Sequence, residues 1–362
     1  MASKITVATI DPMELVIDAG MEDLIAKPQS EYLMLRPAEL DSQGFLRGYV
    51  QDLPDADYHA RRPMPGVELK WPVVTQSIIK YAVHETMAHC KLSLDGKLQR
   101  KKTKALAKGS LLHAVLFGRL HEVVVVDYHS YQPDAAQKIR DAAYAVGRCP
   151  VLRHEFEEIL VPALNLRDWL LRHYGLDVAK ALSEVSVYWT VEVDGATIQC
   201  QGRLDLFFPP PLMPEFLIAD LKNPEDASTN SIQRDTSKYS YEAQPFVYGE
   251  AVRVIEGLSE HPRFEVIHWE KPTGLVNMTR FDAEAIEDGR VQWELGLTRI
   301  ARALRTGDWP GHVEPGKFNV ITSDPYKSAR LQELSKLEGL GKLPANLRSQ
   351  VADLLAGLSS DN

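Results

Sequence analysis

The stretch EFLIADLKNPEDAS, residues 215–228, decides the fold. Its apolar residues 216–219 predict a buried strand, and that strand ends in Asp220, Leu221 and Lys222. Side chains alternate across a strand, so Asp220 and Lys222 lie on the same face. Burial makes an unpaired charge costly. A simple salt bridge between the two is one interpretation, and a shared functional site at the end of the sheet is the other.

The segment just before it, residues 186–208, predicts a hairpin. Two runs of strand-forming residues flank Asp194 and Gly195, a typical hairpin turn. The second run reaches Asp205, which lies beside Asp220 if the two strands are neighbours. Adjacent carboxylates repel each other and raise each other's pKa. A hard divalent cation such as Mg²⁺ removes this conflict, because it takes carboxylate oxygens as ligands.

The remaining pattern predicts helices on both sides of this strand region. We expect helices over residues 75–91, 104–117, 134–145, 152–174, 236–256 and 283–305, and two more strands around residues 272–274. This order predicts an α/β fold with a central mixed β-sheet flanked by helices. We expect an N-terminal extension over residues 1–57, one domain over 58–310 and a helical tail over 311–362.

Composition excludes several classes of protein. The 362 residues are 44% hydrophobic and 25% charged, as in ordinary globular proteins. The three cysteines form no CxxC pair, so we expect neither a disulfide framework nor a zinc or iron–sulfur site. The apolar runs are too short to cross a bilayer, and the first residues do not resemble a signal peptide. We therefore expect a cytoplasmic protein with no membrane partner.

The net charge and the local distribution of charge give opposite indications about nucleic-acid binding. The net charge of −9 argues against a nucleic-acid partner when it is taken as an average. One stretch, residues 97–108, is nevertheless strongly basic and contains no acidic residue. Its candidate DNA-contacting residues are Arg100, Lys101, Lys102, Lys104 and Lys108. A solvated basic loop is the alternative.

Four short motifs occur in order along the chain. They are GSLLH at residues 109–113, Asp205, DLK at residues 220–222, and QPFVY at residues 244–248. This order resembles the PD-(D/E)XK nucleases of the RecB-like branch, and most closely the RecE (exodeoxyribonuclease VIII) type of phage recombination exonuclease. The stretches DYHA, GRLDLF and IHWEKP also resemble that type. The resemblance implies a restriction-endonuclease-like core.

The resemblance also implies a role for each motif residue. His113, Asp205 and Asp220 would be metal ligands, together with the backbone carbonyl of Leu221. Lys222 would be the catalytic lysine, which steadies the nucleophile or the developing charge. Taken without the resemblance, a lone histidine such as His113 is more simply explained as a satisfied core residue.

Three further polar residues complete the set. Gln244 and Tyr248 lie one helical turn apart and would orient the lysine or hold the scissile phosphate. Pro245 costs a hydrogen bond inside a helix, so we expect Gln244 in the first turn of a helix that starts later than residue 236. Glu184 resembles an acid found ahead of the hairpin in this branch and could reach the metal through water; a strand-edge surface charge is the alternative.

The resemblance implies a Mg²⁺-dependent exonuclease, with Mn²⁺ as a possible substitute, that digests duplex DNA ends processively from 5′ to 3′. It also implies a ring-shaped homo-oligomer and a single-strand annealing protein as partner. An endonuclease or single-strand nuclease on the same core stays open, as does an inactive DNA-binding scaffold. ATP is not expected: the near P-loop GHVEPGKF, residues 311–318, has Phe318 in place of the hydroxyl that holds Mg²⁺.

Overall fold

The computed structural model describes residues 35–70, 72–98, 111–146, 148–210, 212–271, 273–322 and 324–337. The chain divides into two compact units, with the boundary after Gly311. The second unit contains helix α10 (Pro325–Leu337). No helix in the described part of the chain combines the length and hydrophobicity needed to cross a membrane. Every element discussed below belongs to the first unit.

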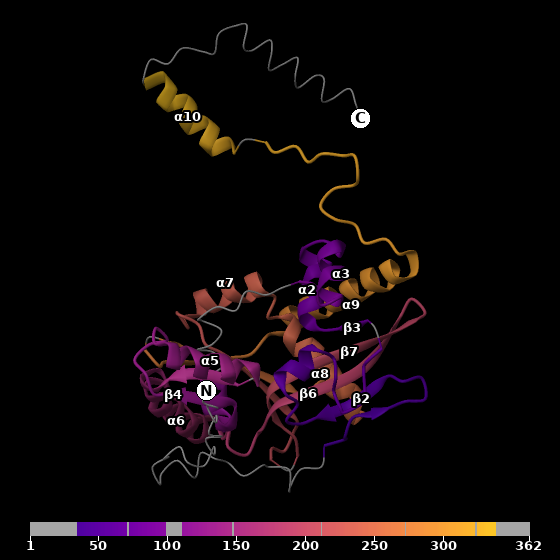
Figure 1. The fold of residues 1–362 in the computed structure, drawn as a ribbon. Helices are drawn as coiled ribbons and strands as arrows, with labels where there is room; N and C mark the ends of the chain where they lie inside the picture. The colour runs from indigo at the N-terminus through magenta and orange to yellow at the C-terminus, as the bar shows by residue number, and fades with distance from the viewer. Residues whose placement is uncertain are drawn as a thin grey trace, which may run out of the picture. The chain divides into compact units, whose positions relative to one another are not determined.

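A mixed sheet forms the centre of the first unit (Figure 1). Its strands pair in the order β1-β2-β6-β7-β8-β9-β10, and β3 pairs with β7. Their bounds are β1 Glu39–Leu40, β2 Leu46–Val50, β3 Val73–Val74, β6 Leu182–Val193, β7 Ala196–Phe208, β8 Leu217–Lys222, β9 Arg263–Trp269 and β10 Val276–Thr279. The β3–β7 and β8–β9 pairs are parallel and the other pairs are antiparallel. The predicted α/β fold with a mixed sheet is confirmed.

Helices surround this sheet, and a small parallel sheet of β4 and β5 lies beside it. Figure 1 shows α5, β4 and α6 grouped together, apart from the group formed by α2, α3 and α9. Their bounds are α1 Asp55–His59, α2 Gln76–His84, α3 Met87–Leu94, η2 Leu120–Glu122, β4 Val123–Val126, α5 Asp134–Ala145, β5 Cys149–Leu152, α6 Arg153–Tyr174, α7 Thr229–Tyr239, α8 Ala243–Glu256 and α9 Ala283–Thr306.

Local sequence explains where these helices begin and end. The hydroxyls of Thr75 and Thr86 accept hydrogen bonds from the first-turn amides of α2 and α3, so the single helix expected over residues 75–91 is two. Residues 111–116 are helical, as expected, whereas residues 104–110 lie outside the described residues. Gly175 takes the left-handed conformation that ends α6.

Two of the predictions need correction. Residues 39–40 and 46–50, expected in an N-terminal extension, form β1 and β2, and β2 pairs with β6 in the main sheet. The helix expected over residues 236–256 is two helices, α7 and α8, because Ser240 takes a left-handed conformation between them. Helix α8 starts at Ala243, which puts Pro245 in its first turn, where the missing amide costs little.

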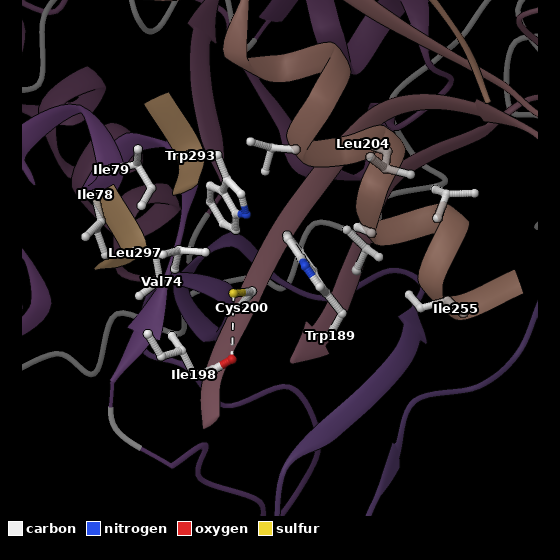
Figure 2. Close-up of a cluster of buried hydrophobic side chains, with 14 of the residues drawn as sticks. Val74, Ile78, Ile79, Trp189, Ile198, Cys200, Leu204, Ile255, Trp293 and Leu297 are labelled. Atoms are coloured by element: carbon white, nitrogen blue, oxygen red, sulfur yellow. Dashed lines mark hydrogen bonds between the residues drawn. The ribbon is translucent and has the colours of Figure 1, made fainter. Parts of the chain in front are cut away.

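Two apolar cores hold the sheet from either side. The first lies between the sheet and helices α2, α8 and α9, where the rings of Trp189 and Trp293 stack with centroids 5.9 Å apart (Figure 2). The second lies between the sheet and α6. In β8 the side chains alternate between these cores: Ile218 belongs to the first, and Ala219 and Leu221 belong to the second. Alternation therefore puts Asp220 on the side of the first core.

Candidate active site

A shift in side-chain alternation marks the site on strands β6 and β7. Leu182 and Val185 both belong to the first core, and so do Leu204 and Phe207. Residues three apart face opposite sides of a regular strand, so each strand changes phase between its two core residues. The change falls at Glu184 in β6 and at Asp205 in β7.

The backbone of Glu184 explains the shift in β6. Its φ is 52°, in the left-handed region that a residue with a side chain rarely occupies. The flanking register pairs Ser183 with Leu206 and Val185 with Leu204, so Glu184 lies across the ladder from Asp205. Strain of this kind persists only where the surroundings enforce it, and it collects at functional sites. Two carboxylates are thereby held at one place in the sheet.

His113, from the helical residues 111–116, approaches these carboxylates from another part of the chain. Its Nδ1 lies 3.1 Å from Oε1 of Glu184. The candidate ligand atoms of His113, Glu184 and Asp205 all lie within 4.8 Å of one another. Burial alone would lower the pKa of His113, but the carboxylates of Asp205, Glu184 and Asp220 outweigh burial and raise it to about 9.

The buried Asp220 and the half-buried Lys222 form an ion pair at the end of β8. The Nζ atom of Lys222 lies 2.5 Å from Oδ2 of Asp220. Burial, reinforced by Asp205, raises the pKa of Asp220 to about 6 although Lys222 opposes the rise. Burial lowers the pKa of Lys222, but Asp220 and Asp205 outweigh it, and the net shift is upward. Lys222 is therefore a charged ammonium at neutral pH.

Gln244 and Tyr248 lie in the first turns of α8, and Gln244 contacts this pair. Gln244 is buried, and its Nε2 donates a hydrogen bond to Oδ1 of Asp220 at 3.3 Å. Gln244 and Lys222 therefore both contact the carboxylate of Asp220. The ring of Tyr248 packs on the backbone of Gly202, where an added Cβ would lie 3.0 Å from its Cε1 atom. Burial raises the pKa of Tyr248 well above its usual value.

Leu221 links the two strands through its backbone. Its N–H donates a hydrogen bond to Oδ2 of Asp205 at 2.9 Å. This bond fixes one carboxylate oxygen of Asp205 against β8. The predicted role of the Leu221 carbonyl as a ligand stays a prediction. Gly109 and the candidate DNA-contacting residues Arg100, Lys101, Lys102, Lys104 and Lys108 lie outside the described residues.

Sequence reasoning did not single out Arg203, which connects the site to α1. Its guanidinium lies 4.1 Å from the ring centroid of Tyr58 and 3.3 Å from Oδ1 of Asp55. On its other side its Nε lies 4.0 Å from Oε2 of Glu184. The sequence contained a signal that could have identified Arg203, because Tyr58 and Arg203 fall within the stretches DYHA and GRLDLF that carry the resemblance. Within GRLDLF, the resemblance implies a role for Asp205 alone.

Arg119 and His268 were also missed. Arg119 is buried and forms ion pairs with Glu122 and with Asp52, whose Oδ1 is 3.6 Å away. His268 faces Lys222 in the parallel register of β8 and β9. Burial and the charge of Lys222 lower the pKa of His268 to about 4, so it is neutral at neutral pH. His268 falls within the stretch IHWEKP, whereas Arg119 lies outside the quoted stretches.

The site opens into a cleft of about 3120 Å³. The cleft is lined at this point by His113, Glu184, Arg203 and Tyr248, and Asn223 lies near the end of β8. Pockets for small molecules measure about 300–1,000 Å³. The cleft therefore has room for a macromolecular ligand.

The donor set fits a divalent cation. One imidazole nitrogen and two carboxylates converge. Burial, reinforced by Glu184, holds the pKa of Asp205 above its usual value although His113 and Lys222 oppose the rise. A hard cation that accepts carboxylate and imidazole ligands would satisfy these groups. His113, Glu184 and Asp205 would hold it, with Asp220 beside them.

Residues 76–322 match the family described as "PDDEXK-like domain of unknown function (DUF3799)". The chain belongs to this family. The match spans the helix that carries His113, the hairpin and β8, and α8, so it covers every residue of the site. Membership of a PDDEXK-like family supports a nuclease and agrees with the mixed α/β fold.

Comparison with curated proteins found no match. Among solved structures, this PDDEXK-like chain is similar to a protein from Eubacterium rectale described as "Putative exonuclease", at 15% identity and a TM-score of 0.46, over 78% of this chain and 98% of that one. It is also similar to the protein SSO0001, at 10% identity and a TM-score of 0.31, over 64% of this chain and 77% of that one.

Proposed function

We propose that this PDDEXK-like protein is a divalent-metal-dependent deoxyribonuclease that hydrolyses phosphodiester bonds. The observation that carries the proposal is the convergence of His113, Glu184 and Asp205 next to the Asp220–Lys222 pair. A salt bridge alone would explain Asp220 and Lys222 but not two further carboxylates and a histidine in the same place. Mg²⁺ is the expected ion and Mn²⁺ a substitute, because both accept oxygen-rich sites.

Each side chain has a task in such a reaction. A cation held by His113, Glu184 and Asp205 would supply Lewis-acid stabilisation of the charge on the phosphate oxygens. Lys222, held by Asp220, is protonated; it therefore donates a hydrogen bond and a positive charge to the attacking water or to the phosphate, and does not act as a base.

The remaining contacts position these groups. Gln244 fixes Asp220, and Asp220 fixes the ammonium of Lys222. The Leu221 amide fixes Asp205. Arg203 lies against Glu184 and packs on the ring of Tyr58. These contacts orient Asp205, Asp220 and Lys222 before substrate binds, which is the condition for strong electrostatic catalysis.

Within this class, the motif resemblance favours a processive 5′-to-3′ exonuclease on duplex DNA ends. A ring-shaped homo-oligomer that encloses the duplex would let a chain with a net charge of −9 stay bound, since topology would replace part of the electrostatic attraction. A single-strand annealing protein would then receive the exposed strand. The cleft size supports a macromolecular substrate.

The test uses linear duplex DNA labelled at either the 5′ or the 3′ end, together with a closed circle, in Mg²⁺ and in EDTA. Release of the 5′ label first, only in Mg²⁺ and with the circle intact, is expected. Cleavage of the circle would assign an endonuclease instead. Binding of DNA with no cleavage in Mg²⁺ or Mn²⁺ would leave a DNA-binding scaffold and overturn the proposal.

A further inference from the structure

Two tyrosines stack at the junction between α7 and α8, next to the site. The ring centroids of Tyr239 and Tyr241 lie 5.5 Å apart, with an interplanar angle of 29°. The Nζ atom of Lys222 lies 4.5 Å from the centroid of Tyr241. The stacked pair therefore begins at the predicted catalytic lysine.

The pair is held in place by its backbone. Ser240, between the two tyrosines, is buried with φ of 53°, so it bends the chain where α7 ends. Gln76 Nε2, from α2, donates a hydrogen bond to the Ser240 carbonyl at 3.1 Å. Lys80, also on α2, donates a hydrogen bond to the Tyr239 carbonyl. A constrained turn anchored to a second helix fixes both rings in advance of any ligand.

The outer end of the pair is exposed and basic. Tyr239 is 38% exposed. The Nζ atom of Lys238 lies 4.9 Å from its ring centroid, and Lys238 is exposed. Lys222, Tyr241, Tyr239 and Lys238 therefore form a continuous row, in which two stacked rings have a lysine at each end, from the site to the solvent.

Such a row matches the chemistry of a single DNA strand. Bases stack on aromatic side chains, and lysines track the phosphates of the backbone. Rigid aromatic rings lose little conformational freedom when they bind, so a pre-fixed pair is suited to this task. A packing role alone would need neither an exposed ring nor a lysine beside it.

We propose that Tyr239, Tyr241 and Lys238 form a stacking platform for one strand of the DNA, with a base on Tyr239 and a phosphate at Lys238. The inference rests on the proposed function and deepens it, because it gives the path of the strand that reaches Lys222. The bound segment is single-stranded, since bases paired within a duplex do not present their faces to a side chain.

The test measures binding of a fluorescent oligothymidine of about 12 nucleotides, within the range that one single-strand site covers. It uses the full chain in EDTA, so that no cleavage occurs. Tyr239→Ala should weaken binding about 5- to 150-fold, the loss expected for one stacked base. Tyr239→Phe keeps the ring and should bind within about twofold of the wild type.

A matched control is Tyr174→Ala. Tyr174, at the end of α6, is 44% exposed and has its ring 5.2 Å from Trp169, so it resembles Tyr239 in exposure and in having an aromatic neighbour. Its loss should leave binding unchanged. Equal binding by wild type and Tyr239→Ala would overturn the proposal, as would equal weakening by Tyr239→Phe.

A second variant, Lys238→Gln, tests the proposal independently in case Tyr239→Ala does not fold. Lys238→Gln changes an exposed side chain and should reduce the slope of log Kd against log salt by about 0.7, the value for one phosphate contact on a single strand. An unchanged slope would contradict the contact with Lys238. Every measurement here is of binding in EDTA and does not depend on cleavage. An absence of nuclease activity would therefore overturn the proposed function without affecting the interpretation of these binding data.

Discussion

The Nζ atom of Lys222 lies 2.5 Å from Oδ2 of Asp220, two residues before it on strand β8. Alternation along the strand turns both side chains toward α8, whose Gln244 holds the other oxygen of Asp220. Asp205, on the neighbouring strand, adds a second negative charge that favours the protonated lysine. The pair thus keeps a positive charge beside the carboxylates of Asp205 and Asp220.

Loss of this charge should remove catalysis and spare DNA binding. We expect Lys222→Ala to lower the cleavage rate about 10²- to 10³-fold, the usual cost of removing one group that stabilises the transition state. Binding to duplex DNA in EDTA should change little. Lys180→Ala is the control, because Lys180 is an exposed lysine paired with Asp177. Full activity in Lys222→Ala would show that the ion pair is only structural.

The left-handed backbone at Glu184 gives a prediction on stability. At an ordinary strand position glycine is less stable than alanine by about 0.5–1 kcal/mol. At Glu184, with φ of 52°, alanine keeps the strain and glycine relieves it. We therefore expect Glu184→Gly to be more stable than Glu184→Ala by about 1 kcal/mol in urea unfolding without metal.

Glu192 provides the control position for this prediction. Glu192 lies on the same strand, is exposed and is not among the described residues with positive φ. There the order should reverse, with Glu192→Ala more stable than Glu192→Gly. Both variants of Glu184 should lose affinity for Mn²⁺, because both lack the carboxylate. The same order of stability at both positions would mean that Glu184 is unstrained.

Metal binding should depend on pH. The carboxylates around His113 raise its pKa to about 9, and burial raises that of Asp220 to about 6. A cation must displace these protons, so its affinity should rise with pH between about 6 and 9 and level off above, by up to about tenfold per pH unit for each proton displaced.

Calorimetric titration with Mn²⁺ at several pH values checks this dependence. His113→Gln removes the group with the higher pKa and should flatten the upper part of the curve, in addition to weakening binding. Affinity that stays constant from about pH 6 to 9 would indicate that His113 releases no proton to the metal.

Gly202 tests the packing beneath Tyr248. An added Cβ would lie 3.0 Å from Cε1 of Tyr248 and 3.2 Å from Cγ1 of Val187, so one of the two must move. Gly202→Ala should cost about 1–3 kcal/mol of unfolding free energy and should lower the cleavage rate by displacing Tyr248. Gly311→Ala meets nothing within 4 Å and should be neutral. An unchanged unfolding free energy and cleavage rate in Gly202→Ala would show that the ring of Tyr248 can move aside without cost.

The sequence was sufficient for the parts of the site that follow local rules. Strand alternation places Asp220 and Lys222 on one face, and the structure has them there as an ion pair. The cost of proline inside a helix indicated a late start for the helix that carries Gln244, and α8 begins at Ala243. Both inferences depend only on neighbouring residues.

Other features depend on contacts between distant segments. The position of Glu184 opposite Asp205 depends on the phase change at this residue, which regular alternation gives no reason to expect. Residues 39–50 contain short apolar pieces broken by polar residues, and only pairing with β6 makes them strands. Ser240 is not a typical helix terminator, and anchoring by Gln76 fixes its left-handed conformation.

The most direct test of the account combines metal binding with DNA hydrolysis in one variant. Asp205→Asn removes the carboxylate shared by the ligand set and the lysine environment while keeping the side-chain shape. Calorimetry with Mn²⁺ and hydrolysis of linear duplex DNA in Mg²⁺ would be measured for the wild type and the variant. We predict that the wild type binds the ion and cuts DNA only when it is present, and that Asp205→Asn does neither. Hydrolysis by the wild type in EDTA, or by Asp205→Asn at the wild-type rate, would contradict a metal-dependent nuclease at this site.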